Sequence, residues 1–265
     1  MNISLKGARN TRDLGGVVTP LGTICPKRLI RSGHLGKITA EDEQILLQNN
    51  LARVIDLRTT TEQANTPDVQ IGGVEYVTIP IISATTFGIT YEKSSGEEIG
   101  QMLQAGIQRM LDRGDNPENH LEILYKKFVN EPIGRKGYGE FLKLLANNPV
   151  QGATLWHCSA GKDRVGTCTA LLLHCLGASK EQIMADYMLT NEQSKGFVDM
   201  VLGKIRGKLD DYQISLILGM LSVKESYLKS FWTEIESRYG NVDNFIAECG
   251  VTQDDIQNLR KNYLK

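Results

Sequence analysis

The sequence contains no run of about 18 apolar residues, the minimum length of a membrane-spanning helix. Its opening residues, MNISLKGARN, lack the apolar stretch of a signal peptide. We therefore expect no integral membrane segment and a cytoplasmic location, or a secreted protein if a leader has been removed. The formal net charge of −1 gives no general attraction to nucleic acid, so we expect no nucleic-acid partner, and any affinity for phosphate must be local.

Cysteine and histidine are also scarce, and their spacing argues against two further classes of protein. The five cysteines are an odd number at irregular positions, which speaks against a disulfide framework and is typical of a reducing compartment. Neither Cys-x-x-Cys nor His-x3-His occurs among these residues and the four histidines. We therefore expect neither a metal site nor a cofactor.

The stretch LWHCSAGKDRVGT at 155–167 contains the residues most indicative of a reactive site. The preceding GATLWH predicts a short buried strand, and VGTCTALLLHCLG from 165 predicts a buried helix that ends at Gly177. The loop between them meets a helix N-terminus, where backbone N–H groups lack partners and the helix dipole favours negative charge. The small residues Ser159, Ala160 and Gly161 allow these N–H groups to turn inward as a phosphate-binding nest.

Two residues of this loop predict a reaction. Arg164 is expected to grip two phosphate oxygens with its planar fork. A helix N-terminus and nearby cations lower the pKa of a cysteine thiol, so Cys158 is expected to attack phosphorus as a thiolate. Cys25 and Arg31 repeat the spacing in CPKRLIR, but Pro26 removes a backbone donor there and no glycine allows the chain to curl. We interpret Cys25 as a small hydrophobic residue beside a strand.

The segment HCSAGKDR resembles the His-Cys-x-x-Gly-Lys-Asp-Arg loop of the protein-tyrosine-phosphatase superfamily. The chain is most similar to its bacterial atypical branch of dual- or triple-specificity phosphatases, which act on phosphotyrosine and phosphoinositides. The resemblance implies metal-independent phosphomonoester hydrolysis through a phosphocysteine, on protein phosphotyrosine, with phosphoserine, phosphothreonine and phosphoinositides as further substrates. Further matching segments follow in the family's order: NTRDLGG at 10–16, RSGHL at 31–35, VIDLRTTTE at 54–62, DYMLTN at 186–191 and YLKSFWTEIESRYG at 227–240.

Two departures from the family pattern bear on turnover. Many relatives carry Ser or Thr directly after the loop Arg, whereas this chain has Val165, so we predict slow breakdown of the phosphocysteine unless Ser159 or Thr167 substitutes. Neither Trp is followed by Pro-Asp, so the usual loop that carries the general acid is missing. A catalytically weak phosphate-binding or sensor module is therefore the alternative function. Thiol redox chemistry on the same loop is a third hypothesis. It normally needs a second, resolving cysteine within reach of Cys158, and Cys168 is poorly placed for this because it lies within the predicted helix.

The general acid must come from another carboxyl group. Asp163 in the loop is the first candidate, as proposed for similar atypical phosphatases. Asp56 ends the strand-like ARVID, at the sheet edge where α/β proteins bind ligands, and is expected to orient Arg164 or the loop, with an acid role as a lesser alternative. Asp112 and Asp115 are candidates only if the segment that carries them closes over the site.

Other residues receive supporting roles. Lys162 is expected to contact a neighbouring phosphate of the substrate. His157 is expected to hold the loop through backbone hydrogen bonds. Arg12 and Asp13 are interpreted as an ion pair at a tight turn, and Arg58 and Glu62 as structural. The predicted substrate- and phosphate-binding set is Ser159, Ala160, Gly161, Lys162, Val165 and Asp56.

The order of predicted elements indicates an α/β fold with a central, mostly parallel sheet flanked by helices. We expect a helix over 39–50 and strands over 51–58 and 72–81. Residues 83–135 interrupt this pattern as a helical insertion, with helices near 97–112 and 119–129, and form either a lid or a peripheral addition. Residues 179–265 are expected to be helical, with starts near Ser179, Ser222 and Thr252. The prediction is one phosphatase domain over 1–265, of undetermined oligomeric state.

Overall fold

The computed structural model describes residues 1–84, 96–205 and 207–265. Within them a five-stranded sheet runs in the order β1-β4-β7-β5-β6, and a two-stranded sheet pairs β2 with β3. The large sheet is parallel except for β1, which is antiparallel to β4, so the predicted fold class is confirmed. The strands are β1 Arg12–Asp13, β2 Val18–Thr19, β3 Gly22–Thr23, β4 Leu29–Ser32, β5 Leu51–Asp56, β6 Glu75–Thr78 and β7 Ala153–His157.

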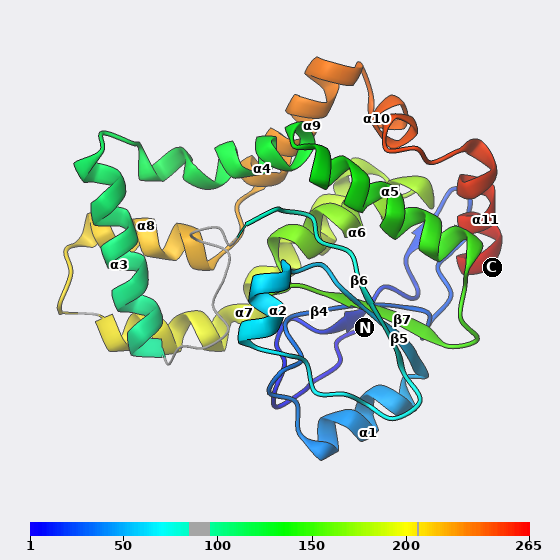
Figure 1. Cartoon of the computed structure of the whole chain (residues 1–265), viewed down its shortest axis with the longest axis horizontal. Coiled ribbons are helices and arrows are strands. Elements are labelled where there is room, and N and C mark those ends of the chain that lie inside the picture. The colour runs from blue at the N-terminus through cyan, green and yellow to red at the C-terminus, as the bar shows by residue number, and fades with distance from the viewer. Residues whose placement is uncertain (85–95, 206) are drawn as a thin grey trace.

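Helices cover both faces of the large sheet (Figure 1). Strand β7 lies at its centre, and its alternating side chains enter two apolar clusters. Leu155 packs on the face covered by α1, together with Leu46, whereas Trp156 packs on the face covered by α5 and α6. The helices are α1 Ala40–Gln48, α2 Thr60–Asn65, α3 Gly96–Asp112, α4 His120–Asn130, α5 Pro132–Asn147, α6 Asp163–Cys175, α7 Lys180–Ile205, α8 Asp211–Leu221, α9 Glu225–Tyr239, α10 Val242–Glu248 and α11 Gln253–Tyr263.

Parallel pairing brings the carboxyl ends of three strands to one edge of the sheet. His157 at the end of β7 is in register with Ser32 at the end of β4 and with Asp56 at the end of β5. Ligands of open α/β sheets bind at this edge. The loop that follows β7 therefore opens where the sequence predicts the phosphate site.

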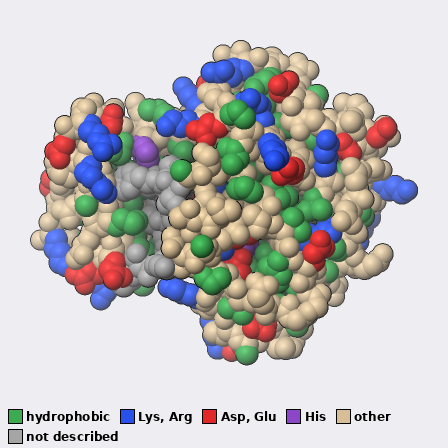
Figure 2. Space-filling view, in the orientation of Figure 1, with side chains coloured by type: hydrophobic (Ala, Val, Ile, Leu, Met, Phe, Trp, Pro, Cys, Tyr) green, Lys and Arg blue, Asp and Glu red, His purple; other side chains and the backbone are tan. Residues whose placement is uncertain are grey.

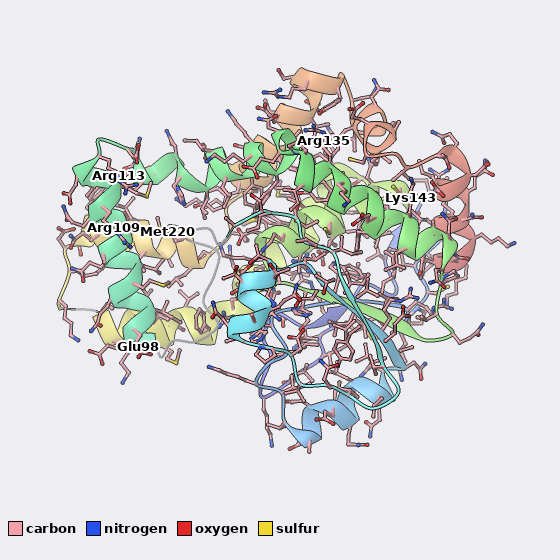
Figure 3. The ribbon with its side chains drawn as sticks, viewed as in Figure 1. Glu98, Arg109, Arg113, Arg135, Lys143 and Met220 are labelled. Atoms are coloured by element: carbon pink, nitrogen blue, oxygen red, sulfur yellow. The ribbon has the colours of Figure 1, made fainter. Side chains whose placement is uncertain are left out.

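A third apolar cluster lies apart from the sheet, in the group formed by α3, α8 and the last turns of α7 (Figure 1). Its buried members include Leu103 of α3, Leu202 of α7 and Ile217 of α8. Met220 of α8 belongs to the cluster, and Arg109 is an exposed residue of α3 (Figure 3). We call this cluster the α3–α8 cluster.

Several boundaries follow the sequence predictions. Helix α1 begins after Thr39, which forms a capping box with Asp42, and α11 begins after Thr252 with the same motif. The start predicted near Ser222 is displaced, since α9 begins at Glu225. Helices α3 and α4 occupy the predicted insertion, and residues 85–95 of that insertion lie outside the described residues. None of the described helices has the length and apolarity needed to cross a membrane.

Candidate active site

The loop from Cys158 to Arg164 joins β7 to α6 through a tight curl. Gly161 adopts a positive φ of 71°. A Cβ atom at this position would lie 2.6 Å from the Ser32 carbonyl oxygen and 2.6 Å from the Gly33 nitrogen, so only glycine fits. Cys158 itself is 1% exposed. The sequence prediction of a glycine-dependent loop at the strand end matches this geometry.

Three carbonyl groups of the loop are held from outside the curl. The Cys158 oxygen lies 3.2 Å from His157 Nδ1, the Ser159 oxygen accepts from His34 N at 3.1 Å, and the Gly161 oxygen accepts from Asn10 Nδ2 at 2.6 Å and Arg31 Nη2 at 2.9 Å. The described peptide bonds are trans, so the N–H that follows each carbonyl points to the opposite side. The N–H groups of Ser159, Ala160 and Lys162 therefore point away from these holding contacts, as an anion nest requires.

Arg164 is fixed by a carboxylate that the sequence interpretation had assigned a structural role. Its Nη1 and Nη2 atoms donate to the two oxygens of Glu62 at 2.7 and 2.8 Å, in a fully buried fork. Glu62 is itself held by Thr59, whose backbone nitrogen donates to Oε2 at 2.9 Å in the capping box of α2. The Thr-x-x-Glu spacing announces this cap in the sequence, but not the contact with Arg164.

Asp56 has a different partner from the one expected. Its carboxylate accepts from the backbone nitrogen of Arg58 at 2.9 Å and from Arg58 Nη2 at 2.8 Å. The expectation that Asp56 orients Arg164 is corrected: Glu62 does so, because α2 and not the end of β5 presents its carboxylate to the guanidinium. Asp56 instead fixes Arg58.

Asp163 is buried at the first turn of α6 and receives two donors on the same oxygen. Tyr125 of α4 donates to Oδ1 at 3.0 Å and Lys162 Nζ at 3.1 Å. The hydroxyl of Tyr187 lies 2.7 Å from that of Tyr125 and extends the chain of hydrogen bonds. Among the described residues Oδ2 has no hydrogen-bond partner. The two donors therefore occupy Oδ1 and leave Oδ2 as the oxygen of Asp163 that no described residue contacts by a hydrogen bond.

Lys162 does not have the position that the sequence interpretation expected. Its side chain is 2% exposed, and Nζ contacts Asp163 and, at 3.5 Å, the Ser222 carbonyl. The adjacent carboxylate compensates the burial of the ammonium group. In this structure Lys162 supports Asp163 rather than facing a second phosphate.

Comparisons with known proteins show the family of this chain. A family model described as "Tyrosine phosphatase family" matches residues 3–265. The chain belongs to this family. The phosphatase is 26% identical over 259 residues to a putative tyrosine-protein phosphatase of Cupriavidus necator, covering 96% of this chain and 85% of that protein. It is 25% identical over 281 residues to the triple specificity protein phosphatase PtpB of Mycobacterium tuberculosis, covering 97% and 96%. Among solved structures, TpbA of P. aeruginosa matches with a TM-score of 0.32 and 14% identity, covering 89% and 96%.

A buried network of charged side chains lies beside Cys158 in the phosphatase. His157 Nε2 lies 2.9 Å from Asp68 Oδ2 and 3.9 Å from Asp56 Oδ1, while Nδ1 faces the Cys158 carbonyl. Both ring nitrogens thus face acceptors, the environment of an imidazolium. Burial lowers the pKa of His157, but the Asp56 and Asp68 carboxylates outweigh burial and raise it. The sequence interpretation anticipated a loop-holding His157 and missed Asp68.

His34 completes this network on the side of β4. Its Nε2 lies 3.5 Å from Asp68 Oδ1, and burial together with the charge of Arg58 lowers the pKa of His34 to about 4. His34 is therefore neutral near pH 7 and places no second imidazolium beside His157. The ligand atoms of Asp56, Asp68 and His157 lie within 4.8 Å of one another, a spacing that a metal ion also uses. Arg58 already supplies positive charge to both carboxylates, so we interpret the group as an ion-pair network.

Val165 and Thr167 are both committed to the interior of the phosphatase. Val165 is fully buried in the main apolar cluster. The Thr167 hydroxyl accepts from Tyr138 at 3.0 Å and donates to the Arg164 carbonyl at 3.1 Å. Thr167 is thus poorly placed to replace the hydroxyl missing at 165, which leaves Ser159 as the remaining candidate from the sequence.

Arg12 and Asp13 do not form the ion pair that the sequence interpretation expected. Arg12 Nε donates to Asp186 of α7 at 2.8 Å, whereas Asp13 accepts from the backbone nitrogens of Gly15 and Lys27 at 3.0 and 2.7 Å. Asp186 also contacts Arg31, the residue that holds the Gly161 carbonyl. A helix of the C-terminal part therefore reaches the loop through these two arginines.

Asp112 and Asp115 are exposed, at and just beyond the end of α3. Asp112 accepts from Gln108 of its own helix at 2.8 Å. Neither position favours them over the loop residue Asp163 as the general acid.

Proposed function

We propose that the phosphatase hydrolyses protein phosphotyrosine through a phosphocysteine on Cys158, without a metal ion. The observation that carries this proposal is the closed loop around Cys158, with its carbonyls held from outside and its Arg164 fork fixed by Glu62. Such an arrangement preorganises N–H donors and one guanidinium around a transferring phosphoryl group. Little reorganisation is then needed as charge develops on the equatorial oxygens.

The reaction proceeds in two displacements. Cys158 Sγ attacks phosphorus, the S–P bond forms, and the bond from phosphorus to the tyrosine oxygen breaks. Asp163 Oδ2 donates its proton to that leaving oxygen, a service worth roughly 10²–10⁴-fold in rate. Asp163 then accepts a proton from water as the water oxygen attacks phosphorus, the S–P bond breaks, and inorganic phosphate and the thiolate are released.

The substrate proposal starts from phosphotyrosine. The buried position of Lys162 removes the contact from which a preference for phosphoinositides was inferred. Phosphoserine, phosphothreonine and phosphoinositides remain further substrates of this proposal because the family resemblance implies them. A relative of similar length bears the name triple specificity protein phosphatase.

We further propose that the insertion over 83–135 acts as a lid on the same domain. The argument rests on Ala160, a loop residue that packs into the α3–α8 cluster and is 6% exposed. Residues of α3 such as Ile99 and Leu103 belong to that cluster. Closing the cluster over the loop would exclude water from the phosphoryl group, and opening it would admit substrate.

The deciding experiment is release of p-nitrophenol from its phosphate ester, with chelator present, by wild type and Cys158→Ser. We expect metal-independent turnover in the wild type and none in the variant. Binding of phosphate esters without release of phosphate by either protein would contradict the proposal and favour the alternative, a phosphate-binding sensor. Turnover that survives in Cys158→Ser would exclude the cysteine mechanism.

A further inference from the structure

A long groove opens beside the phosphate loop. Its volume is about 980 Å³, and Ser159 of the loop, His34 and Asn10 lie among its lining residues. One wall is the N-terminal segment 2–11 with Lys37, and the other is the face of α7 that carries Glu192, Phe197 and Lys204. The groove therefore starts at the proposed catalytic site and continues along a helix.

The two ends of the groove are set by contacts with the loop. Asn10 donates to the Gly161 carbonyl, and its side chain lies 3.5 Å from Thr190, two residues before Glu192 on α7. The Glu192 end is therefore the catalytic end. Lys204 lies twelve residues further along α7, which corresponds to about 18 Å of helix. An extended peptide covers this length with about five residues. A single inositol ring would fill only a small part of it.

The charges change sign along this length. Glu192 is exposed at the catalytic end. In the middle, the Arg9 guanidinium stacks 3.6 Å above the ring of Phe197. The exposed ammonium group of Lys204 follows further along α7, and Lys37 is exposed on the opposite wall. Lys6 also lines the groove, but it is paired with Glu41. Glu97 of α3 also lies within range of the charge of Lys204, but it is paired with Lys208 at 2.9 Å. The α7 wall thus carries a negative charge at the catalytic end and a positive charge at the distal end.

We propose that this groove binds the polypeptide that flanks the phosphotyrosine and selects substrates with acidic residues about four or five positions away from it. The inference rests on the proposed phosphotyrosine activity and adds a sequence preference to it. Acidic side chains at the distal positions meet Lys204, whereas an acidic residue next to the phosphotyrosine meets Glu192. The pattern selected is therefore a neutral or basic position near the phosphate and an acidic pair further along the chain.

The test uses phosphotyrosine peptides that differ only in one pair of residues. The pair is Ala-Ala, Glu-Glu or Lys-Lys, placed at the distal or at the adjacent positions, on the N-terminal side in one set and on the C-terminal side in another. We expect kcat/KM for distal Glu-Glu to exceed that for Ala-Ala by about two- to five-fold in one of the two sets, the range of one or two exposed ion pairs. At 1 M salt, where the screening length is about 3 Å, the preference should vanish.

Charge reversal assigns the preference to the groove. Lys204→Glu is expected to lose the preference for distal Glu-Glu and to gain one for distal Lys-Lys, a gain that general damage to the protein cannot produce. The matched control is Lys195→Glu, on the same helix but outside the described lining of the groove, where Lys195 pairs with Asp199 at 2.6 Å. This control should keep the wild-type ratio of distal Glu-Glu to Ala-Ala.

The outcomes separate this inference from the proposed function. Equal kcat/KM for all peptides in the wild type, or equal ratios in Lys204→Glu and Lys195→Glu, would overturn the groove inference while phosphotyrosine hydrolysis stands. A Lys204→Glu loss seen only with a soluble inositol phosphate would assign the groove to that headgroup and also overturn it. No turnover of any peptide or of p-nitrophenyl phosphate would instead remove the proposed function.

Discussion

Single side chains around the loop owe their roles to buried charge. Arg164 is fully buried, and an uncompensated buried charge costs several kcal/mol, so its guanidinium depends on Glu62 for both stability and direction. The same reasoning applies to His157, which lies between an acceptor carbonyl and Asp68. These partners fix the directions of the Arg164 and His157 side chains.

Glu62→Gln tests the first pairing. Glutamine can still cap α2 after Thr59, but it cannot accept two charged hydrogen bonds from Arg164. We expect kcat/KM on p-nitrophenyl phosphate to fall about 10- to 100-fold through misplacement of the fork. Steady-state kinetics measure the loss, and the melting temperature reports the accompanying loss of stability. Activity within twofold of wild type would show that the fork is held without Glu62.

Asp68→Asn tests the second pairing through pH. The raised pKa of His157 means that its ion pair stabilises the fold fully below the ordinary histidine value of 6.5, and that this contribution is lost as pH rises through the raised pKa. Burial raises the pKa of Asp68, but the charges of His157 and Arg58 outweigh burial and lower it. The ionised carboxylate therefore stabilises the fold fully above the ordinary aspartate value of 3.8, and this stabilisation is lost as pH falls through the lowered pKa.

The stabilisation by both charges is complete in the pH range from 3.8 to 6.5. In that range the free energy of unfolding of Asp68→Asn should fall below that of the wild type by about 3–5 kcal/mol. Urea unfolding over a series of pH values measures the difference. A difference that stays constant from pH 5 to strongly alkaline pH would refute a charged His157.

Val165→Thr restores the hydroxyl that many family members carry after the loop arginine. We expect a higher turnover number and a smaller burst of p-nitrophenol, because the hydroxyl assists departure of the Cys158 thiolate. Val165 is fully buried, so the new hydroxyl also costs about 1–3 kcal/mol of stability unless it finds a partner. Pre-steady-state kinetics decide the matter: an unchanged burst and turnover number would mean that breakdown of the intermediate is not slowed by Val165.

Among the elements, the group of α3, α8 and the end of α7 has its own apolar cluster and meets the loop at Ala160. A helix near 97–112 was predicted and is α3, and the helix that begins after the capping residue Thr39 is α1. The packing of α3 against α8 was not predicted, because an amphipathic helix indicates that one face is buried but not against which partner.

Leu103→Ala tests the lid. Leu103 is fully buried in the α3–α8 cluster, and its truncation costs about 2–5 kcal/mol there. We expect faster alkylation of Cys158 by iodoacetamide in the native protein, since a loosened lid exposes the thiol more often. The matched control is Leu145→Ala, an equally buried residue of the main cluster, which should lower the melting temperature without faster alkylation. Equal alkylation rates in the two variants would count against the lid.

At the level of the whole molecule, Asp186 joins segments that are far apart in the sequence. It binds Arg12 near the N-terminus and Arg31 of β4, and Arg31 reaches the carbonyl of Gly161. The charges of these arginines outweigh burial and lower the pKa of Asp186, so it is ionised at neutral pH.

Asp186→Asn should leave two buried guanidinium groups without their carboxylate. We expect a loss of about 3–5 kcal/mol in the free energy of unfolding, together with a lower kcat because the Gly161 peptide is held less firmly. Urea unfolding and steady-state kinetics on p-nitrophenyl phosphate check both effects, with Lys195→Glu as the surface control. A destabilised variant with the kcat of the wild type would show that Asp186 stabilises the fold without affecting the loop, and would contradict the expected loss of kcat.

The sequence by itself determined what depends on neighbours along the chain. The strand, loop and helix around HCSAGKDR, the need for Gly161, and the α/β class follow from apolar periodicity, caps and glycine, each of which acts within a few residues. These features suffice to place Cys158 at the edge of a parallel sheet.

Only the tertiary structure decided which charges meet. Glu62 and Arg164 are 102 positions apart, and Asp186 lies 155 positions from Arg31. Such pairs depend on strand order and on how helices cross the sheet, which no local pattern encodes. Lys162 pairs with its sequence neighbour Asp163, but the other partners of the two residues come from far along the chain: Tyr125 of α4 donates to Asp163, and the Ser222 carbonyl accepts from Lys162. The loop around Cys158 was therefore predictable from the sequence, while the side chains that hold it in place required the folded chain.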